Sequence, residues 1–177
     1  MKQRQDKVMY LLERHGRSLH RLVARLTRCE HATHDLMQEL FIKLSSSRGL
    51  DGADNPYAYA WRAATNLAFD WRRRQRVKLV PLEGDSYAEK SEASALGRMV
   101  QAERLERILE ATSRLSELAR NAVIMRFIEQ ESYEEIGMRL GKNPDHVRSL
   151  CSKSLARLRE ILAERDDTRM DREVSHG

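Results

Sequence analysis

The stretch SYEEIGMRLGKNPDHVRSLCSKSLARLRE, residues 132–160, decides the fold of the second half of the chain. It predicts two short helices separated by a tight turn. Ser132 and Glu135 have the spacing of a capping box, in which each side chain accepts a hydrogen bond from the other residue's backbone amide. Gly141 suits a left-handed helix end, and Pro144 suits a first helical turn, where its missing N–H would have no partner. The sequence therefore predicts a capped helix pair.

The second helix of this pair, which Asn143 is expected to cap, has two faces of opposite character. Apolar residues repeat at helical spacing on one face, from Val147 to Leu162. Short polar and cationic side chains occupy the other face, as in a recognition helix that enters the major groove of DNA. A solvated helix face is the alternative interpretation. The residues that we expect to contact DNA are Asp145, His146, Arg148, Ser149, Ser152 and Lys153.

This region resembles region 4 of the sigma-70 family of RNA polymerase initiation factors. The resemblance is carried by SYEEIGMRLGKNPDHVRSL from Ser132 and by LSELARNAVIMRF from Leu115. Small extracytoplasmic-function (ECF) members of the family have a similar segment, L-S-Y-E-E-I-A-x-x-L-G-x-S-x-x-T-V-K-S-R. The resemblance implies a helix-turn-helix that reads the −35 promoter element. Leu150 and the pair Asn143-Pro144 depart from the pattern, which bears on the base preference rather than on the docking mode.

A second motif, HDLMQELFIKL at residues 34–44, predicts a helix with a broad apolar stripe in which Phe41 packs inward. Two acids, an amide and one isoleucine gather on the opposite side, either as a solvated face or as a docking patch. The pattern D-L-x-Q-E-x-F resembles sigma region 2.2, the helix that binds the clamp helices of the polymerase β′ subunit. The resemblance implies that polymerase is bound by Asp35, Gln38, Glu39 and Ile42.

A third motif, NPYAYAWRAATNLAFDWRRRQRVK at residues 55–78, predicts a helix that Asn55 and Pro56 begin and whose core side includes Leu67 and Trp71. Cations interleaved with aromatics suit nucleic acid, because arginine neutralises phosphates while aromatic rings stack on unpaired bases. Core aromatics beside a solvated basic end are the alternative. The residues that we expect to contact DNA are Arg62, Asn66, Phe69, Arg73, Arg74 and Arg76.

This third motif resembles sigma regions 2.3 and 2.4, roughly P-x-A-W-L-Y-R-I-A-R-N-L-A-x-D-W-x-R-R. In the family, these regions read the −10 element and hold the nontemplate strand open, with one base captured in a pocket formed partly by the loop before the helix. Here that loop is SSSRGLDGADN, Ser45 to Asn55. Extruding a base costs a few kcal/mol of unstacking, which contacts in the pocket must offset.

Composition and charge favour a polyanionic partner, with a formal net charge of +5 and a pI near 9.4. We expect a cytoplasmic protein without membrane insertion, because no signal peptide or spanning segment is evident. Cys29 and Cys151 are expected to be free thiols. The cluster Cys29, His31 and His34 lacks a fourth ligand for zinc, so we expect polar residues around a helix junction there and no metal. The sequence has no Walker motif, dinucleotide fingerprint, nucleophile elbow or His-Glu-x-x-His pair, so we also expect no cofactor and no catalysis.

The sequence as a whole predicts an all-α protein with two small helical domains. Residues 5–78 form a region 2-like bundle, residues 79–98 a flexible linker, residues 99–164 a region 4-like helix-turn-helix domain, and residues 165–177 a polar tail. The resemblance implies a sigma factor whose partners are core RNA polymerase, at its β′ clamp helices and β flap, promoter DNA and an anti-sigma factor. A stand-alone helix-turn-helix regulator is the alternative.

Overall fold

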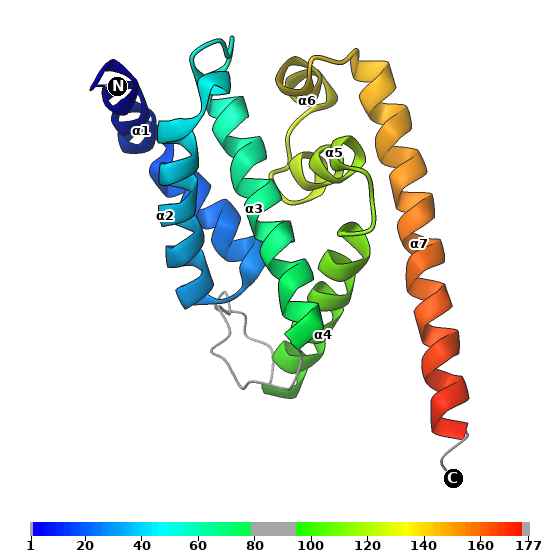
Figure 1. Cartoon of the computed structure of the whole chain (residues 1–177). Helices are drawn as coiled ribbons and strands as arrows, with labels where there is room; N and C mark the ends of the chain where they lie inside the picture. The colour runs from blue at the N-terminus through cyan, green and yellow to red at the C-terminus, as the bar shows by residue number, and fades with distance from the viewer. Residues whose placement is uncertain (1, 79–94, 175–177) are drawn as a thin grey trace. The chain divides into compact units, whose positions relative to one another are not determined.

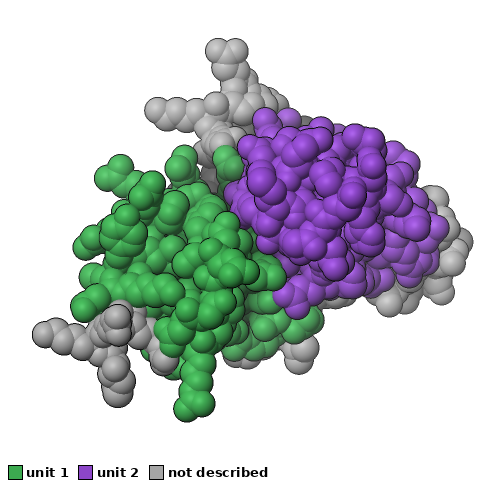
Figure 2. Space-filling view, turned by 90° about the horizontal axis from the view of Figure 1, so that it is seen from above, with its two compact units in different colours: residues 1–92 green, residues 93–177 purple. Residues whose placement is uncertain are grey.

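The computed structural model of the chain describes residues 2–78 and 95–174, and every regular element in these ranges is helical. The helices form two compact units, residues 1–92 and residues 93–177, which Figure 2 colours separately. The predicted all-α class with two small helical domains is confirmed. No described helix combines the length and apolar character needed to cross a bilayer.

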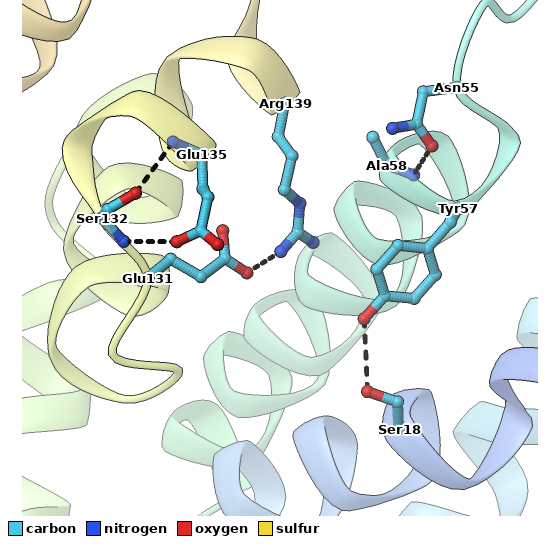
Figure 3. A network of polar contacts seen from close by, with 8 residues as sticks. All are labelled: Ser18, Asn55, Tyr57, Ala58, Glu131, Ser132, Glu135 and Arg139. Carbon is cyan, nitrogen blue, oxygen red and sulfur yellow. Dashed lines mark hydrogen bonds and ion pairs between the residues drawn. The ribbon is translucent and has the colours of Figure 1, made fainter.

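The first unit packs three long helices against one another (Figure 1): α1 (Lys2–Thr27), α2 (Glu30–Ser46) and α3 (Pro56–Lys78), with a single 3-10 turn, η1 (Arg48–Leu50), before α3. Trp61 and Phe69 of α3 are the largest fully buried side chains in this core. Asn55 caps α3 by accepting a 2.9 Å hydrogen bond from the amide of Ala58, as predicted (Figure 3).

The junction between α1 and α2 is a closed polar turn. The hydroxyls of Thr27 and Thr33 are 2.9 Å apart, and Thr33 also donates to the carbonyl of Cys29 at 2.8 Å. Arg28 has a positive φ of 55°, which lets the chain reverse between the helices. The cluster of Cys29, His31 and His34 therefore lies at a helix junction. His34 lies 3.9 Å from Glu30, and its ring meets the ring of His20 edge to face.

The second unit contains α4 (Ala95–Thr112), α5 (Glu117–Phe127), α6 (Tyr133–Leu140) and α7 (Pro144–Val174). Both α5 and α6 pack against the first half of α7, and α4 contacts α7 as well. Ser116 caps α5 by accepting from the amide of Ala119 at 3.4 Å. Ile124, Met125 and Ile136 are among the largest fully buried side chains of this unit. One cluster of its core is formed by the buried residues Ala111, Leu115, Ala119, Val123, Leu158 and Ile161.

Two predicted boundaries differ from the structure. The fourth helix begins at Ala95 rather than at residue 99, and the backbone of α7 remains helical to Val174, ten residues beyond the expected end at Glu164. Neither glycine nor proline interrupts the chain between Pro144 and Gly177, so the polar composition alone does not end the helix. The predicted linker, residues 79–98, lies largely outside the described residues.

Gly141 provides a test of the turn between α6 and α7. Its φ is 63°, and nothing lies within 4 Å of a Cβ built on it, so a side chain there is opposed only by its own backbone. We expect Gly141→Ala to lower the stability of the second unit by about 1–2 kcal/mol, and Gly141→Asn to cost less. Urea unfolding followed by circular dichroism measures the change.

Tryptophan fluorescence supplies the control, because both tryptophans, Trp61 and Trp71, lie in the first unit. The Gly141 variants should leave the unfolding transition of the first unit at the same urea concentration. Gly16→Ala should instead raise the free energy of unfolding of the first unit by up to about 1 kcal/mol. Gly16 lies inside a helix, and its added methyl would meet only Leu12 Cβ at 4.0 Å. A destabilised first unit in Gly141→Ala would contradict the local explanation.

Candidate functional site

One face of α2 is polar, open and centred on an apolar side chain. Asp35, Gln38 and Glu39 are exposed, and Ile42 is 65% exposed, as predicted from the helical spacing. The face is held by leucines on the other side of the helix, which are fully or almost fully buried: Leu36, Leu40 and Leu44. Ile42 with its neighbouring acids and amide has the layout of an apolar centre with a polar rim.

Phe41 corrects one prediction for this helix. It is 36% exposed rather than packed inward, so its ring adds apolar surface beside Ile42. Met37, on the predicted apolar stripe, is half-buried. The three leucines, one turn apart, lie in the middle of the buried stripe of α2, and Met37 and Phe41 lie at its edge.

The open side of α3 is narrow. Arg62, Asn66 and Asp70 are half-buried and follow one another at four-residue steps, and the exposed Arg73 comes three residues later. The expectation that Phe69 faces this side is wrong, because its ring is fully buried. Because both α1 and α2 pack on α3, the buried side of α3 is wider than that of a surface helix. Phe69 lies at the edge of this wider side and is covered.

One of the two tryptophans of α3 also differs from expectation. Trp61 is fully buried, whereas Trp71, predicted to face the core, is half-buried. The ring of Trp61 therefore anchors the helix. The spacing of core positions predicted alanines and leucine correctly, with Ala60, Ala64 and Leu67 all buried.

At the basic end of α3, one arginine is buried in the fold and the next two are exposed. Arg72 is 7% exposed, and its Nη1 donates a 3.0 Å hydrogen bond to the carbonyl of Leu26 at the end of α1. Arg73 and Arg74 are exposed, and Arg73 pairs with Asp70 at 2.5 Å. The side chain of Arg76 lies outside the described residues.

A shallow depression joins this basic end to the face of α2. It has a volume of about 440 Å³ and is lined by Glu39, Leu67, Asp70, Arg73 and Arg74. The structure thus places one residue of the predicted polymerase-binding set next to two of the predicted DNA-binding set.

The loop before α3 is tied to the helices by polar contacts. The hydroxyls of Ser47 and Tyr59 are 2.6 Å apart, and Leu50 is fully buried while its carbonyl accepts from Lys7 Nζ at 3.0 Å. A Cβ at Gly49 would lie 2.9 Å from the Tyr59 hydroxyl, so a larger residue there would have to displace the Tyr59 ring, whose hydroxyl is paired with Ser47. The first half of the loop is therefore anchored, while Asp51, Gly52, Asp54 and Asn55 are exposed.

The capping box of α6 is formed as predicted (Figure 3). Ser132 Oγ accepts from the amide of Glu135 at 3.1 Å, and Glu135 Oε2 accepts from the amide of Ser132 at 2.7 Å. The hydrogen bonds from the backbone and side chain of Ser132 hold the pKa of Glu135 below its ordinary value. Just before the box, Glu131 forms an ion pair with Arg139 that is largely covered.

The turn between α6 and α7 depends on two glycines. Gly141 ends α6 in the left-handed conformation, and the amide of Lys142 donates to the carbonyl of Gly137 at 2.9 Å. A Cβ at Gly137 would lie 2.6 Å from the Lys142 carbonyl oxygen, so only glycine fits without moving the backbone. Asn143 Oδ1 accepts from the amide of Asp145 at 2.9 Å and caps α7, as predicted.

The two faces of α7 are arranged as predicted. Val147, Cys151 and Leu158 are buried, and burial raises the pKa of the Cys151 thiol against the opposing charge of Arg126. The six side chains predicted to contact DNA are all exposed: Asp145, His146, Arg148, Ser149, Ser152 and Lys153.

Sequence reasoning missed one residue beside this face, Tyr133. The guanidinium carbon of Arg126 lies 4.7 Å from the centre of its ring, and that of Arg148 lies 5.3 Å from it. Tyr133 is the first residue of α6, and its half-buried ring carries no pattern that predicts a contact with another helix.

Comparison with known families assigns both units. The model of sigma-70 region 2 matches residues 11–77, and that of sigma-70 region 4 matches residues 111–160. The chain belongs to the sigma-70 family of RNA polymerase sigma factors. It is a transcription initiation factor.

Relatives of this sigma factor are similar over most of its length. The ECF RNA polymerase sigma factor SigE of Mycolicibacterium smegmatis is 33% identical over 87% of this chain, which spans 61% of that protein. The RNA polymerase sigma factor CarQ of Myxococcus xanthus is 29% identical over 90% of this chain and 91% of its own. The structure of CnrH in complex with the cytosolic domain of CnrY covers 90% of each chain at 20% identity and a TM-score of 0.50, which shows a similar fold.

The adjacent arginines of the sigma factor's α3 provide a matched test. Arg72→Ala removes a charged donor to a buried carbonyl and should cost about 1.5–3 kcal/mol of stability in the first unit. Arg73→Ala removes an exposed pair with Asp70 and should change stability by less than about 0.5 kcal/mol. Urea unfolding followed by tryptophan fluorescence compares the two variants. Equal losses would show that the basic run is structural throughout.

Proposed function

We propose that this sigma factor binds core RNA polymerase through the α2 face of Asp35, Gln38, Glu39 and Ile42. The observation that carries the proposal is the exposed Ile42 at the centre of that face. An apolar side chain ringed by polar groups gains free energy when a partner covers it, and the polar groups fix the register of docking. The β′ clamp helices of the polymerase are the proposed partner, because the α2 motif resembles sigma region 2.2.

The open side of α3 and the loop before it are proposed to bind the −10 element and the separated nontemplate strand. Arg62 and Asn66 lie along the helix, and Arg73 and Arg74 at its end supply the charge that attracts phosphates. The side chain of Phe69 takes no part, because the core covers it. The depression beside Glu39 supports this arrangement, since a strand bound there would lie next to a polymerase bound on α2.

The exposed face of α7 is proposed to enter the major groove at the −35 element. Its first turns carry Arg148 and Lys153 for phosphates and base edges, and Ser149 and Ser152 for shorter contacts. The β flap of the polymerase and an anti-sigma factor are proposed as further partners of the chain. We place its action in the cytoplasm, where polymerase and DNA lie.

Reversal of charge on the α2 face tests the polymerase contact. Asp35→Arg combined with Ile42→Glu replaces attraction by charge repulsion and puts a carboxylate where an apolar group would be covered. We expect affinity for core polymerase to fall by about 30-fold or more, which corresponds to at least 2 kcal/mol. Promoter opening should be lost, while helical content and thermal stability persist because both side chains are exposed.

A control variant on α1 makes the same changes in charge at another exposed surface. Glu13→Arg combined with Met9→Glu alters one acid and one exposed apolar residue, at four-residue spacing. It should bind polymerase as the unmodified chain does. If the α2 variant still binds core polymerase and opens promoters, this face is not the docking site. A stand-alone helix-turn-helix regulator would bind its DNA equally well in both variants and would not bind polymerase at all.

A further inference from the structure

The exposed face of α7 carries one arginine that is held on two sides, Arg148. Its Nη1 donates to Asp145 Oδ1 at 3.2 Å, three residues earlier on the same helix. Its guanidinium carbon lies 5.3 Å from the centre of the Tyr133 ring on α6. The side chain is nevertheless 61% exposed, so most of it stays accessible to a ligand.

The ring of Tyr133 is itself fixed in place. Tyr133 directly follows Ser132, the N-cap residue of α6, so the capping box sets its backbone position. The guanidinium carbon of Arg126, at the end of α5, lies 4.7 Å from the same ring centre. Arg126 Nη1 donates to the carbonyl of Glu131 at 2.8 Å, which ties that arginine to the segment before α6. Tyr133 therefore links the ends of three helices.

Fixing an arginine matters for some contacts more than for others. A phosphate accepts a guanidinium from many directions, whereas a base edge requires two N–H groups in one plane at one position. A cation over an aromatic ring at an exposed site gains about 2- to 5-fold in population, and an exposed ion pair gains at most about 5-fold. Neither contact is strong alone, but together they reduce the conformational freedom that Arg148 would lose on binding.

We infer that Tyr133 is a positioning residue that holds Arg148 to read a base pair. The base that fits a planar guanidinium is guanine, whose O6 and N7 accept two N–H groups in the major groove. Asp145 supports this role, because its carboxylate offsets part of the arginine's charge and weakens its attraction to phosphates in general. The inference rests on the proposed function of α7 at the −35 element.

The test uses core RNA polymerase reconstituted with the full chain and a promoter library randomised across the upstream element. Sequencing of bound promoters gives the preference at each base pair. Arg148→Ala should lose about 5- to 150-fold of preference for guanine at one position. Tyr133→Leu should lose about 2- to 5-fold at that same position and nowhere else. Tyr133→Phe keeps the ring and should retain the preference.

The double variant separates positioning from a direct contact. In the Arg148→Ala background, Tyr133→Leu should have no further effect on preference, because the residue that it positions is gone. These preferences are ratios between sequences that compete for the same folded molecules, so partial unfolding of a variant does not change them. Circular dichroism of each variant reports folding separately.

Several results would overturn the inference. These are a Tyr133→Leu variant that weakens all sequences evenly, a Tyr133→Phe variant as impaired as Tyr133→Leu, or an additional loss in the double variant. A preference that does not depend on Arg148 would also overturn it while leaving the proposed function intact. If the unmodified chain shows no binding to polymerase, or no upstream preference, the proposed function fails and the inference fails with it.

Discussion

The direction of α7 depends on how closely the chain folds back against α6. The Lys142 carbonyl lies where a side chain at Gly137 would be, and Gly141 turns the backbone through a conformation that other residues adopt at a cost. The amide of Lys142 closes the turn on the carbonyl of Gly137. Because the turn is this tight, the crossing of α6 and α7 is set by the backbone, and the exposed side chains of α7 inherit a fixed direction.

A similar division between fixed and open groups recurs in the first unit. On α3, Arg72 is bonded to the end of α1 while its neighbour Arg73 faces outward. On the loop before α3, Leu50 is buried while Asp54 is exposed. In each case a buried contact one or a few residues away holds the backbone under an exposed side chain, an arrangement that keeps exposed groups within a narrow geometry.

Sequence patterns predicted those features that depend on neighbours along the chain. The capping box at Ser132, the left-handed Gly141 and the outward face from Asp145 to Lys153 all follow from local rules, and the structure has each of them. Whether Phe69 and Phe41 are buried depends instead on how many helices surround α3 and α2, which periodicity does not encode. The contact of Tyr133 with Arg148 likewise requires the crossing of α6 and α7 to be known.

Under the role proposed for α3 at the −10 element, its narrow open side limits how promoter preference can change in evolution. From Ala58 to Phe69, every position is buried except Tyr59, Arg62 and Asn66, which are half-buried. Tyr59 is paired with Ser47 of the loop, so only Arg62 and Asn66 belong to the open side. Substitution at the buried positions would alter packing before it altered recognition. New specificities are therefore expected to arise in the loop from Asp51 to Asn55, where exposed residues can vary without disturbing the bundle.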